Sequence, residues 1–279
     1  MGENRFFISG CQRSGTTLLR LVLECHPTVY VHDELASYKA LAGRRFDLPP
    51  GKDVVGFKVP RWAECLADEL AWDDGIAEAA ERPWRDEPLV FVYRDVRDTI
   101  ASMRKLRMTA DESWLEFCAK PILRAKFERT PLGLKFAAEW DAVRAAGEPG
   151  VLVGALYWKY KNAALFDYLA AGRPVLPLRY EDLVADPEPH LRRVCRFLDV
   201  GWDSRLLMHP ALEHTEVFHN GTVMGNTDPK RAIDTASVGQ WREWLTGDEE
   251  EAVMEIAGEM NGRLAKLGRR GWLRRLTGA

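Results

Sequence analysis

Residues 6–19 read Phe6-Phe7-Ile8-Ser9-Gly10-Cys11-Gln12-Arg13-Ser14-Gly15-Thr16-Thr17-Leu18-Leu19, and this stretch decides the fold. Its apolar start predicts a short buried strand. Gly10 to Gly15 then predicts a tight loop, and the apolar run from Leu18 to Leu23 is long enough for a helix. A strand, a glycine loop and a helix in this order present backbone N–H groups and a helix N-terminus to phosphate or a similar anion.

The spacing of the two glycines is close to that of a Walker A loop, G-x-x-x-x-G-K-[ST]. Thr16, however, stands where that loop has its lysine. The nearest strong cation is Arg13, whose planar guanidinium suits phosphate or sulfate. The loop therefore indicates an oxyanion site that is not built for ordinary ATP chemistry. A P-loop kinase or NTPase remains an alternative, because its loop differs chiefly at Thr16, and a coincidental glycine turn before a core helix remains another.

The length suits one large α/β domain or two small ones and allows a substantial core, and because no clean domain boundary is visible we expect a single domain over residues 1–279. The formal net charge of −3 gives no sign of nucleic-acid binding, so an anionic ligand needs a local basic pocket. The five cysteines are scattered singly, which favours a reducing compartment over a disulfide framework or a zinc site. We expect no signal peptide and no membrane span, and therefore a cytoplasmic protein.

Three titratable residues follow the first helix. Val29 to Val31 predicts a short extended segment, and His32, Asp33 and Glu34 come directly after it. Chemistry in α/β sheets collects at the carboxyl ends of strands. If the extended segment continues, His32 and Glu34 share one face and Asp33 points away, because side chains alternate along a strand. Either His32 or Glu34 is then a candidate general base, and His32 has the unperturbed pKa closest to neutral pH.

Two further strands end in a cation. Val54 to Val59 reads as a buried strand that carries Lys58 near its end, just before a proline. Lys58 is either a site residue or a snorkelling lysine on an edge strand. Leu89 to Tyr93 is a clear buried strand that leads into Arg94, and Asp95 or Asp98 can cap the helix that follows. Ser102 is expected about one turn inside that helix, where it and Arg94 can converge on one phosphate.

The remaining segments complete an α/β pattern. Residues 61–88 and the aromatic-rich residues 106–172 are expected to be helical, with most aromatics in the core. Val175 to Tyr180 reads as a strand near a sheet edge, because it contains an early proline. A polar, glycine-containing stretch from His219 to Ser237 predicts a long loop of the kind that is often functional. Its cations are Lys230 and Arg231.

Four of these segments resemble sulfotransferases that use 3′-phosphoadenosine 5′-phosphosulfate (PAPS). The run Arg13-Ser14-Gly15-Thr16-Thr17 resembles their 5′-phosphosulfate loop. Phe91 to Ser102 resembles the segment that holds the 3′-phosphate, with Arg94 and Ser102 in the matching positions. Leu178 to Leu183 with Asp186-Pro187, and later Ser237 to Trp241, are similar to a third and a fourth family segment. The resemblance implies a P-loop NTPase-like parallel sheet flanked by helices, with residues 106–172 as a helical acceptor-side insertion.

The first third of the chain most resembles the tyrosylprotein sulfotransferases. Those enzymes follow the loop with His-Pro, here His26-Pro27, and then with a glutamate base, which falls on Glu34. Lys58 falls where they place a catalytic lysine. The cytosolic small-molecule sulfotransferases use a histidine, which keeps His32 open as the base, although their histidine follows the lysine. The tyrosylprotein enzymes are membrane-anchored and have paired cysteines, and neither feature is expected here.

The resemblance implies transfer of a sulfuryl group from PAPS to a hydroxyl or amine, in a small molecule or a peptide, with release of adenosine 3′,5′-bisphosphate (PAP). No metal is implied. A P-loop kinase and a catalytically silent nucleotide-binding module remain the alternatives. The implied catalytic residues are Glu34, Lys58, Arg13 and His32, and the implied nucleotide-binding residues are Arg13, Ser14, Gly15, Thr16, Thr17, Arg94, Ser102, Tyr180, Lys230 and Arg231.

Overall fold

The structure is a computed structural model, and it describes residues 4–43, 48–66, 86–129, 132–212, 214, 218–219, 222–223 and 227–276. Its internal contacts group the chain into two compact units. Unit 1 comprises Met1–Tyr93 and Leu165–Thr235, and unit 2 comprises Arg94–Ala164 and Ala236–Ala279. The expected single domain over residues 1–279 stays a prediction.

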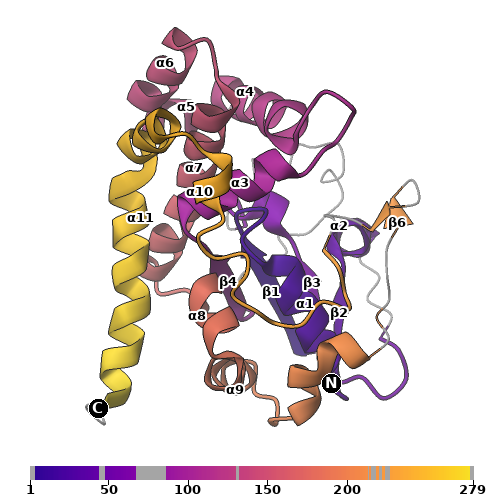
Figure 1. The fold of residues 1–279 in the computed structure, drawn as a ribbon. Helices are drawn as coiled ribbons and strands as arrows, with labels where there is room; N and C mark the ends of the chain where they lie inside the picture. The colour runs from indigo at the N-terminus through magenta and orange to yellow at the C-terminus, as the bar shows by residue number, and fades with distance from the viewer. Residues whose placement is uncertain are drawn as a thin grey trace. The chain divides into compact units, whose positions relative to one another are not determined.

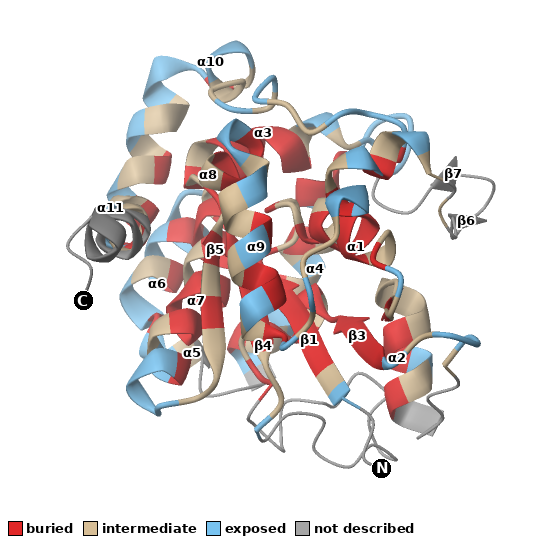
Figure 2. Ribbon diagram, turned by 90° about the horizontal axis from the view of Figure 1, so that it is seen from below, coloured by how far each residue is buried: buried red, intermediate tan, exposed pale blue. Residues whose placement is uncertain are grey.

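Unit 1 is built on a parallel sheet of five strands in the order β2-β3-β1-β4-β5. Figure 1 shows β1 to β4 side by side, and Figure 2 shows β1 and β3 largely in the colour of buried residues. Near-continuous apolar strands are typical of a parallel sheet that is covered on both faces, and the expected fold class is confirmed. The strands are β1 (Asn4–Gly10), β2 (Val29–His32), β3 (Val54–Lys58), β4 (Leu89–Tyr93) and β5 (Val175–Arg179).

Helices of unit 1 pack on one face of this sheet. Helix α1 (Thr16–Glu24) contributes Leu19, Val22 and Leu23 to the core, and α9 (Pro187–Phe197) contributes Leu191 and Val194. Each fully buried leucine or valine of this kind adds about 1.5–3 kcal/mol. Unit 1 also contains α2 (Glu34–Gly43), α8 (Tyr180–Ala185), and the 3₁₀ helices η1 (Pro60–Trp62) and η4 (Ser204–Ala211).

Two expectations for unit 1 are corrected at the ends of elements, and a third is confirmed. The segment after β2 is not extended, because Asp33 accepts hydrogen bonds from the N–H groups of Leu35 and Ala36 and so caps α2 at Glu34. The last strand ends at Arg179, so Tyr180 begins α8 instead. β5 is an edge strand, as its proline predicted.

Two other expected segments are only partly described. Of the helical stretch 61–88, the structure shows η1 and turns to residue 66, and residues 67–85 lie outside the described residues. The expected loop 219–237 begins with a short antiparallel pair, β6 (Phe218–His219) and β7 (Thr222–Val223). From residue 227 to the end of unit 1 the chain has no helix or strand.

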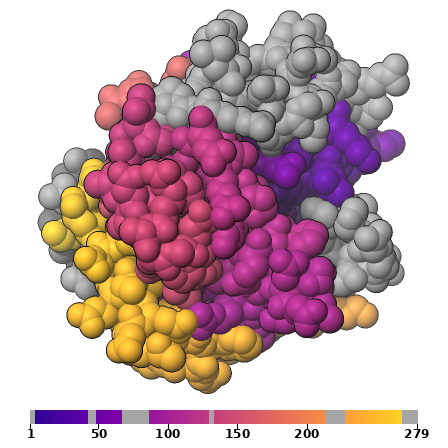
Figure 3. All heavy atoms as spheres, turned by 90° about the horizontal axis from the view of Figure 1, so that it is seen from above, coloured from indigo at the N-terminus to yellow at the C-terminus, as the bar shows by residue number. Residues whose placement is uncertain are grey.

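Unit 2 is helical. Its elements confirm the expected helices of the 106–172 segment, although residues 106–113 form an irregular loop before the first of them. Figure 3 shows the yellow C-terminal residues bordering magenta and rose atoms of this unit. The helices are α3 (Val96–Lys105), the π-helix η3 (Leu115–Ala119), α4 (Lys120–Arg129), α5 (Leu132–Lys135), α6 (Ala137–Ala145), α7 (Gly150–Ala170), whose residues from Leu165 on belong to unit 1, α10 (Trp241–Trp244) and α11 (Gly247–Leu276).

Within the described residues, no helix is both long enough and apolar enough to cross a bilayer. The same part of the chain brings no three His, Cys, Asp or Glu side chains together in a way that could hold a metal ion. The expected cytoplasmic location stays a prediction.

Candidate active site

The loop between β1 and α1 depends on two glycines with positive φ. Gly10 has φ 137°, and a Cβ there would lie 2.0 Å from the carbonyl oxygen of Val92 on the neighbouring strand. Gly15 is the N-cap of α1 with φ 100°, and a Cβ there would lie 2.4 Å from Cδ2 of Tyr180. Only glycine fits at these two positions, and the two glycines allow the loop to turn tightly against the sheet. Tyr180 is thereby placed directly against this loop.

The same loop has unused hydrogen-bonding groups. Ser14 is fully buried, and its hydroxyl has no hydrogen-bond partner within the described part of the chain. The first helical bond to the cap runs from the Leu19 N–H to the Gly15 carbonyl, and the glycine cap supplies no side chain for the earlier N–H groups, which include those of Thr16 and Thr17. A buried hydroxyl beside the first N–H groups of a helix fits a phosphate.

Glu34 and Lys58 meet at the carboxyl ends of two neighbouring strands. Lys58 Nζ lies 3.3 Å from Glu34 Oε2, and both side chains are largely buried. β3 also joins β1 just before the glycine loop, because the Val59 N–H donates to the Ile8 carbonyl at 2.8 Å and Ser9 Oγ donates to the Val59 carbonyl at 3.0 Å. Lys58 therefore sits on the strand next to the strand that leads into the glycine loop. Burial lowers the pKa of Lys58, and the Glu34 carboxylate opposes part of that change.

Helix α2 holds Glu34 in place through two of its other side chains. The Tyr38 hydroxyl donates to Glu34 Oε1 at 3.2 Å and accepts the Arg61 N–H at 3.0 Å. Burial and the Glu34 carboxylate raise the pKa of Tyr38 well above its usual range, so its hydroxyl stays a donor. Ser37 Oγ accepts the Lys58 N–H at 2.9 Å, which ties α2 to β3. Glu34 thus has one oxygen near a cation and the other on a phenol.

His32 is held differently from Glu34. Its ring stacks on Phe57 with centroids 5.2 Å apart and meets Tyr30 edge-on. Its Nε2 is buried and has no hydrogen-bond partner among the residues described. Burial lowers the pKa of His32, although Asp33 opposes this, so the imidazole is neutral near pH 7. The structure brings Glu34, not His32, to Lys58.

The two cations of the late loop are exposed. Arg231 pairs with Asp234, with Nη2 2.5 Å from Oδ1. The Lys230 N–H donates to Asp228 Oδ1 at 2.9 Å, which makes a turn here. Both residues belong to unit 1, and their expected role at the 3′-phosphate stays a prediction.

In unit 2, Arg94 lies just before helix α3 and Ser102 lies within it. Arg94 directly precedes Asp95, the N-cap of α3, and Ser102 lies nearly two turns inside α3 rather than one. Both side chains are buried. Trp158 Nε1 donates to the Arg94 carbonyl at 3.1 Å, and Arg94 Nη2 donates to the carbonyl of Ser237. A buried arginine at a helix N-terminus is suited to an anion.

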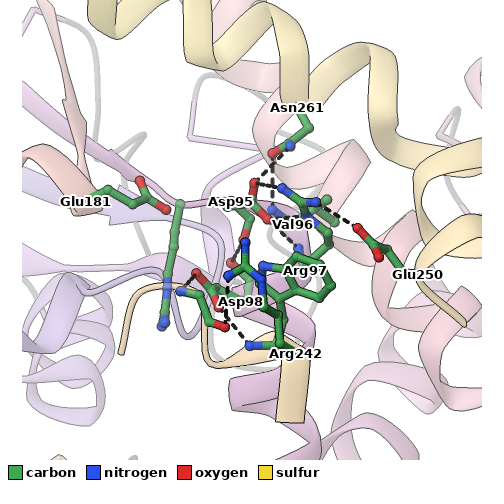
Figure 4. A network of polar contacts seen from close by, with 12 residues as sticks. Asp95, Val96, Arg97, Asp98, Glu181, Arg242, Glu250 and Asn261 are labelled. Atoms are coloured by element: carbon green, nitrogen blue, oxygen red, sulfur yellow. Dashed lines mark hydrogen bonds and ion pairs between the residues drawn. The ribbon is translucent and has the colours of Figure 1, made fainter. Parts of the chain in front are cut away.

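A polar network secures α3 to the C-terminal part of the chain (Figure 4). Asp95 accepts the Arg97 N–H at 2.9 Å and the side chain of Asn261 at 3.0 Å, and Arg97 Nη1 donates to Glu250 at 2.8 Å. Burial raises the pKa of Asp95, but the bonds from Arg97 and Asn261 lower it below its usual value. Asp98, on the same helix, instead accepts hydrogen bonds from the N–H groups of Gly239 and Trp241.

Sequence reasoning missed two of these contributors. Tyr38 stands four residues after Glu34, and that spacing becomes informative once Asp33 is recognised as the cap of a helix. Asp98 was seen only as a possible cap, whereas Asp95 caps α3. Its bonds to Gly239 and Trp241 go to backbone N–H groups, which have no sequence signature.

Known proteins resemble this chain over much of its length. Residues 5–53 and 58–204, more than half of the chain, match the model of the sulfotransferase family. Protein-tyrosine sulfotransferase 1 of Danio rerio is 25% identical over 213 residues, which are 74% of this chain. Protein-tyrosine sulfotransferase A of Caenorhabditis elegans is 23% identical over 261 residues, which are 86% of this chain. The matches span only 56% of the fish protein and 62% of the worm protein.

Solved structures support the fold. The sulfotransferase domain from the Synechococcus PCC 7002 olefin synthase aligns with TM-score 0.53 and 19% identity over 91% of this chain and 94% of that one. Mouse sulfotransferase SULT7A1, solved in complex with PAP, aligns with TM-score 0.51 and 14% identity over 95% of this chain and 90% of that one. With the family model matched over most of the sheet and its loops, the chain belongs to the sulfotransferase family.

Proposed function

We propose that this protein transfers a sulfuryl group from PAPS to a hydroxyl or amine acceptor and releases PAP. The observation that carries the proposal is the largely buried ion pair between Glu34, at the start of α2, and Lys58, at the end of β3, beside a glycine loop whose Ser14 hydroxyl has no hydrogen-bond partner among the described residues. A loop that binds an anion would, by itself, also be expected in a nucleotide-binding module without catalytic activity. A base and a cation held together next to that loop favour catalysis.

In the proposed reaction the acceptor oxygen or nitrogen attacks sulfur as the bond from sulfur to the 5′-phosphate oxygen breaks. Glu34 takes the proton that the acceptor loses. Lys58 stabilises the negative charge that develops on the bridging oxygen, and Arg13 stabilises the sulfuryl oxygens. The N–H groups from Arg13 to Thr17 hold the 5′-phosphate. As in phosphoryl transfer, positioning and charge stabilisation supply most of the rate enhancement.

Glu34 is suited to this task by its two contacts. Lys58 and the Tyr38 hydroxyl fix the orientation of its carboxylate before an acceptor arrives. Each contact uses one lone pair of a different oxygen, so the remaining lone pairs can accept a proton. The acceptor itself is proposed only as a class, a hydroxyl or amine in a small molecule or a peptide. The similarity to protein-tyrosine sulfotransferases makes a phenolic hydroxyl the first candidate.

The nucleotide preference separates this proposal from a P-loop kinase. PAP is expected to raise the melting temperature more than ATP with Mg²⁺, because Thr16 replaces the lysine that contacts the β- and γ-phosphates. At one hundred times its dissociation constant, PAP adds about 2.7 kcal/mol, or roughly 5 °C in melting temperature. Differential scanning fluorimetry measures both ligands side by side. A larger shift with ATP and Mg²⁺ would favour the kinase.

The 3′-phosphate is assigned to Arg94 and Ser102. Arg94→Ala is expected to weaken PAP binding by about 1.5–3 kcal/mol, the usual worth of a hydrogen bond to a charged group. Affinity for adenosine 5′-phosphosulfate, which lacks the 3′-phosphate, should stay nearly unchanged. Isothermal titration calorimetry with both ligands measures the difference. Equal losses for the two ligands would contradict the assignment.

A further inference from the structure

Asp98 is a buried carboxylate in an unexpected place. It lies on α3 four residues before Ser102, so the two residues share a face of the helix, and Arg94 stands just before the same helix. Both of those neighbours are proposed ligands of a phosphate. An uncommitted carboxylate between them would repel that phosphate. Its presence therefore indicates a task other than ligand binding.

Both oxygens of Asp98 are committed to one backbone turn. Oδ2 accepts the Gly239 N–H at 2.8 Å, and Oδ1 accepts the Trp241 N–H at 3.1 Å. Asp98 is 2% exposed, so these bonds are shielded from water. Gly239 has φ 78°, which allows the chain to turn sharply at this point. Charge-assisted bonds of this kind are among the strong ones in proteins. We call residues 237–241 the Asp98-bound turn.

The Asp98-bound turn also holds the side chain of Arg94. The guanidinium of Arg94 donates through Nη2 to the carbonyl of Ser237, the first residue of the turn. Trp158 fixes the Arg94 backbone through its carbonyl, but the side chain has several rotatable bonds beyond that point. The turn therefore restricts the guanidinium, and Asp98 restricts the turn. All of these residues belong to unit 2.

We propose that Asp98 is a positioning residue for Arg94, acting through the Asp98-bound turn. It anchors the Gly239 and Trp241 amides so that the Ser237 carbonyl orients the guanidinium toward a 3′-phosphate. The inference rests on the proposed function, in which Arg94 binds that phosphate. Since both carboxylate oxygens accept N–H groups, the negative charge of Asp98 is partly offset by the donors that it binds.

The test compares two ligands in full-length variants. Asp98→Asn keeps one acceptor oxygen but turns its amide N–H₂ toward the second backbone N–H, so one bond is lost. Calorimetry should show about tenfold weaker binding of PAP and less than twofold change for adenosine 5′-phosphosulfate. Hydrogen exchange at the Gly239 and Trp241 amides should be faster than in the parent, with protection of the unit 1 sheet unchanged.

Glu249→Gln is the matched control. Glu249 also accepts a backbone N–H, that of Thr246 at 2.9 Å, and binds Arg104 of α3, but it does not touch the Asp98-bound turn. It should cost similar stability and leave the ratio of PAP to adenosine 5′-phosphosulfate affinity as in the parent. A change of that ratio in Glu249→Gln as large as in Asp98→Asn would overturn the inference.

The outcomes separate the inference from the proposed function. If Arg94→Ala leaves PAP binding unchanged, the proposed role of Arg94 fails, and the role of Asp98 fails with it. If Arg94→Ala weakens PAP binding and Asp98→Asn does not, or weakens both ligands equally, only the inference is overturned. If Asp98→Asn does not fold, hydrogen exchange of the parent protein still tests the inference. Fast exchange of the Gly239 and Trp241 amides in the parent would overturn it, and slow exchange would support it.

Discussion

Glu34→Gln is expected to lower kcat by about 10²–10⁴-fold, the usual contribution of a general base. Glutamine has nearly the same shape as glutamate, so it keeps the contact with Tyr38 but has no basic carboxylate. The affinity for PAP should not change, because Glu34 is not among the residues assigned to the nucleotide. Initial rates with labelled PAPS and a phenolic acceptor measure kcat, and calorimetry measures PAP binding.

His32→Ala is the comparison for this variant. It removes the competing base but leaves the Glu34–Lys58 ion pair in place, so kcat should fall far less than in Glu34→Gln. Loss of the stacking on Phe57 is expected to lower the stability, and a melting curve measures this loss so that it can be separated from the change in kcat. Near-full activity of Glu34→Gln together with an inactive His32→Ala would reverse the two roles.

Gly10→Ala is expected to destabilise the protein by about 3–5 kcal/mol or to prevent folding. The new Cβ would lie 2.0 Å from the Val92 carbonyl oxygen, a backbone atom inside a paired strand that cannot move aside cheaply. The substitution also forces alanine into a positive φ of 137°. Urea denaturation followed by circular dichroism measures the change in the free energy of unfolding.

Gly51→Ala isolates the collision from the strain. Gly51 also has a positive φ, 81°, but nothing lies within 4 Å of a Cβ built there. Its cost should be about 1–2 kcal/mol, the price of a left-handed conformation in an L-residue. If Gly10→Ala lowers the free energy of unfolding no more than Gly51→Ala does, the close packing of Gly10 against Val92 of β4 is contradicted.

The local parts of this fold and site were predictable from the sequence. The apolar run of β1, the two glycines and the apolar start of α1 follow one another directly, so local pattern alone predicts the strand, the glycine loop and the helix. Lys58 stood out because a lysine at the end of a buried strand is unusual, and its burial is confirmed while its catalytic role stays a prediction. Glu34 was proposed as the base through family resemblance. The prediction that it lies in an extended segment was wrong, because the capping role of Asp33 was not recognised.

Contacts between distant segments were not predictable in the same way. The pairing of Glu34 with Lys58 depends on the strand order, which places β2 beside β3 rather than beside β1. The bonds from Asp98 to Gly239 and Trp241 depend on backbone N–H groups that every non-proline residue has. Side-chain chemistry can suggest that a buried carboxylate needs donors, but it does not identify which turn supplies them.

The Asp98-bound turn has a consequence for the order of folding. The bond from Asp98 to Gly239 joins residues 141 positions apart, so forming it closes a long loop and costs chain entropy. During synthesis, at about 5–20 residues per second, Gly239 is made roughly 7–28 s after Asp98. The Glu34–Lys58 ion pair joins residues that are made within seconds of each other. Both residues of the proposed catalytic pair are thus present early in synthesis, whereas the anchor of Arg94 cannot form until Gly239 and Trp241 have been made.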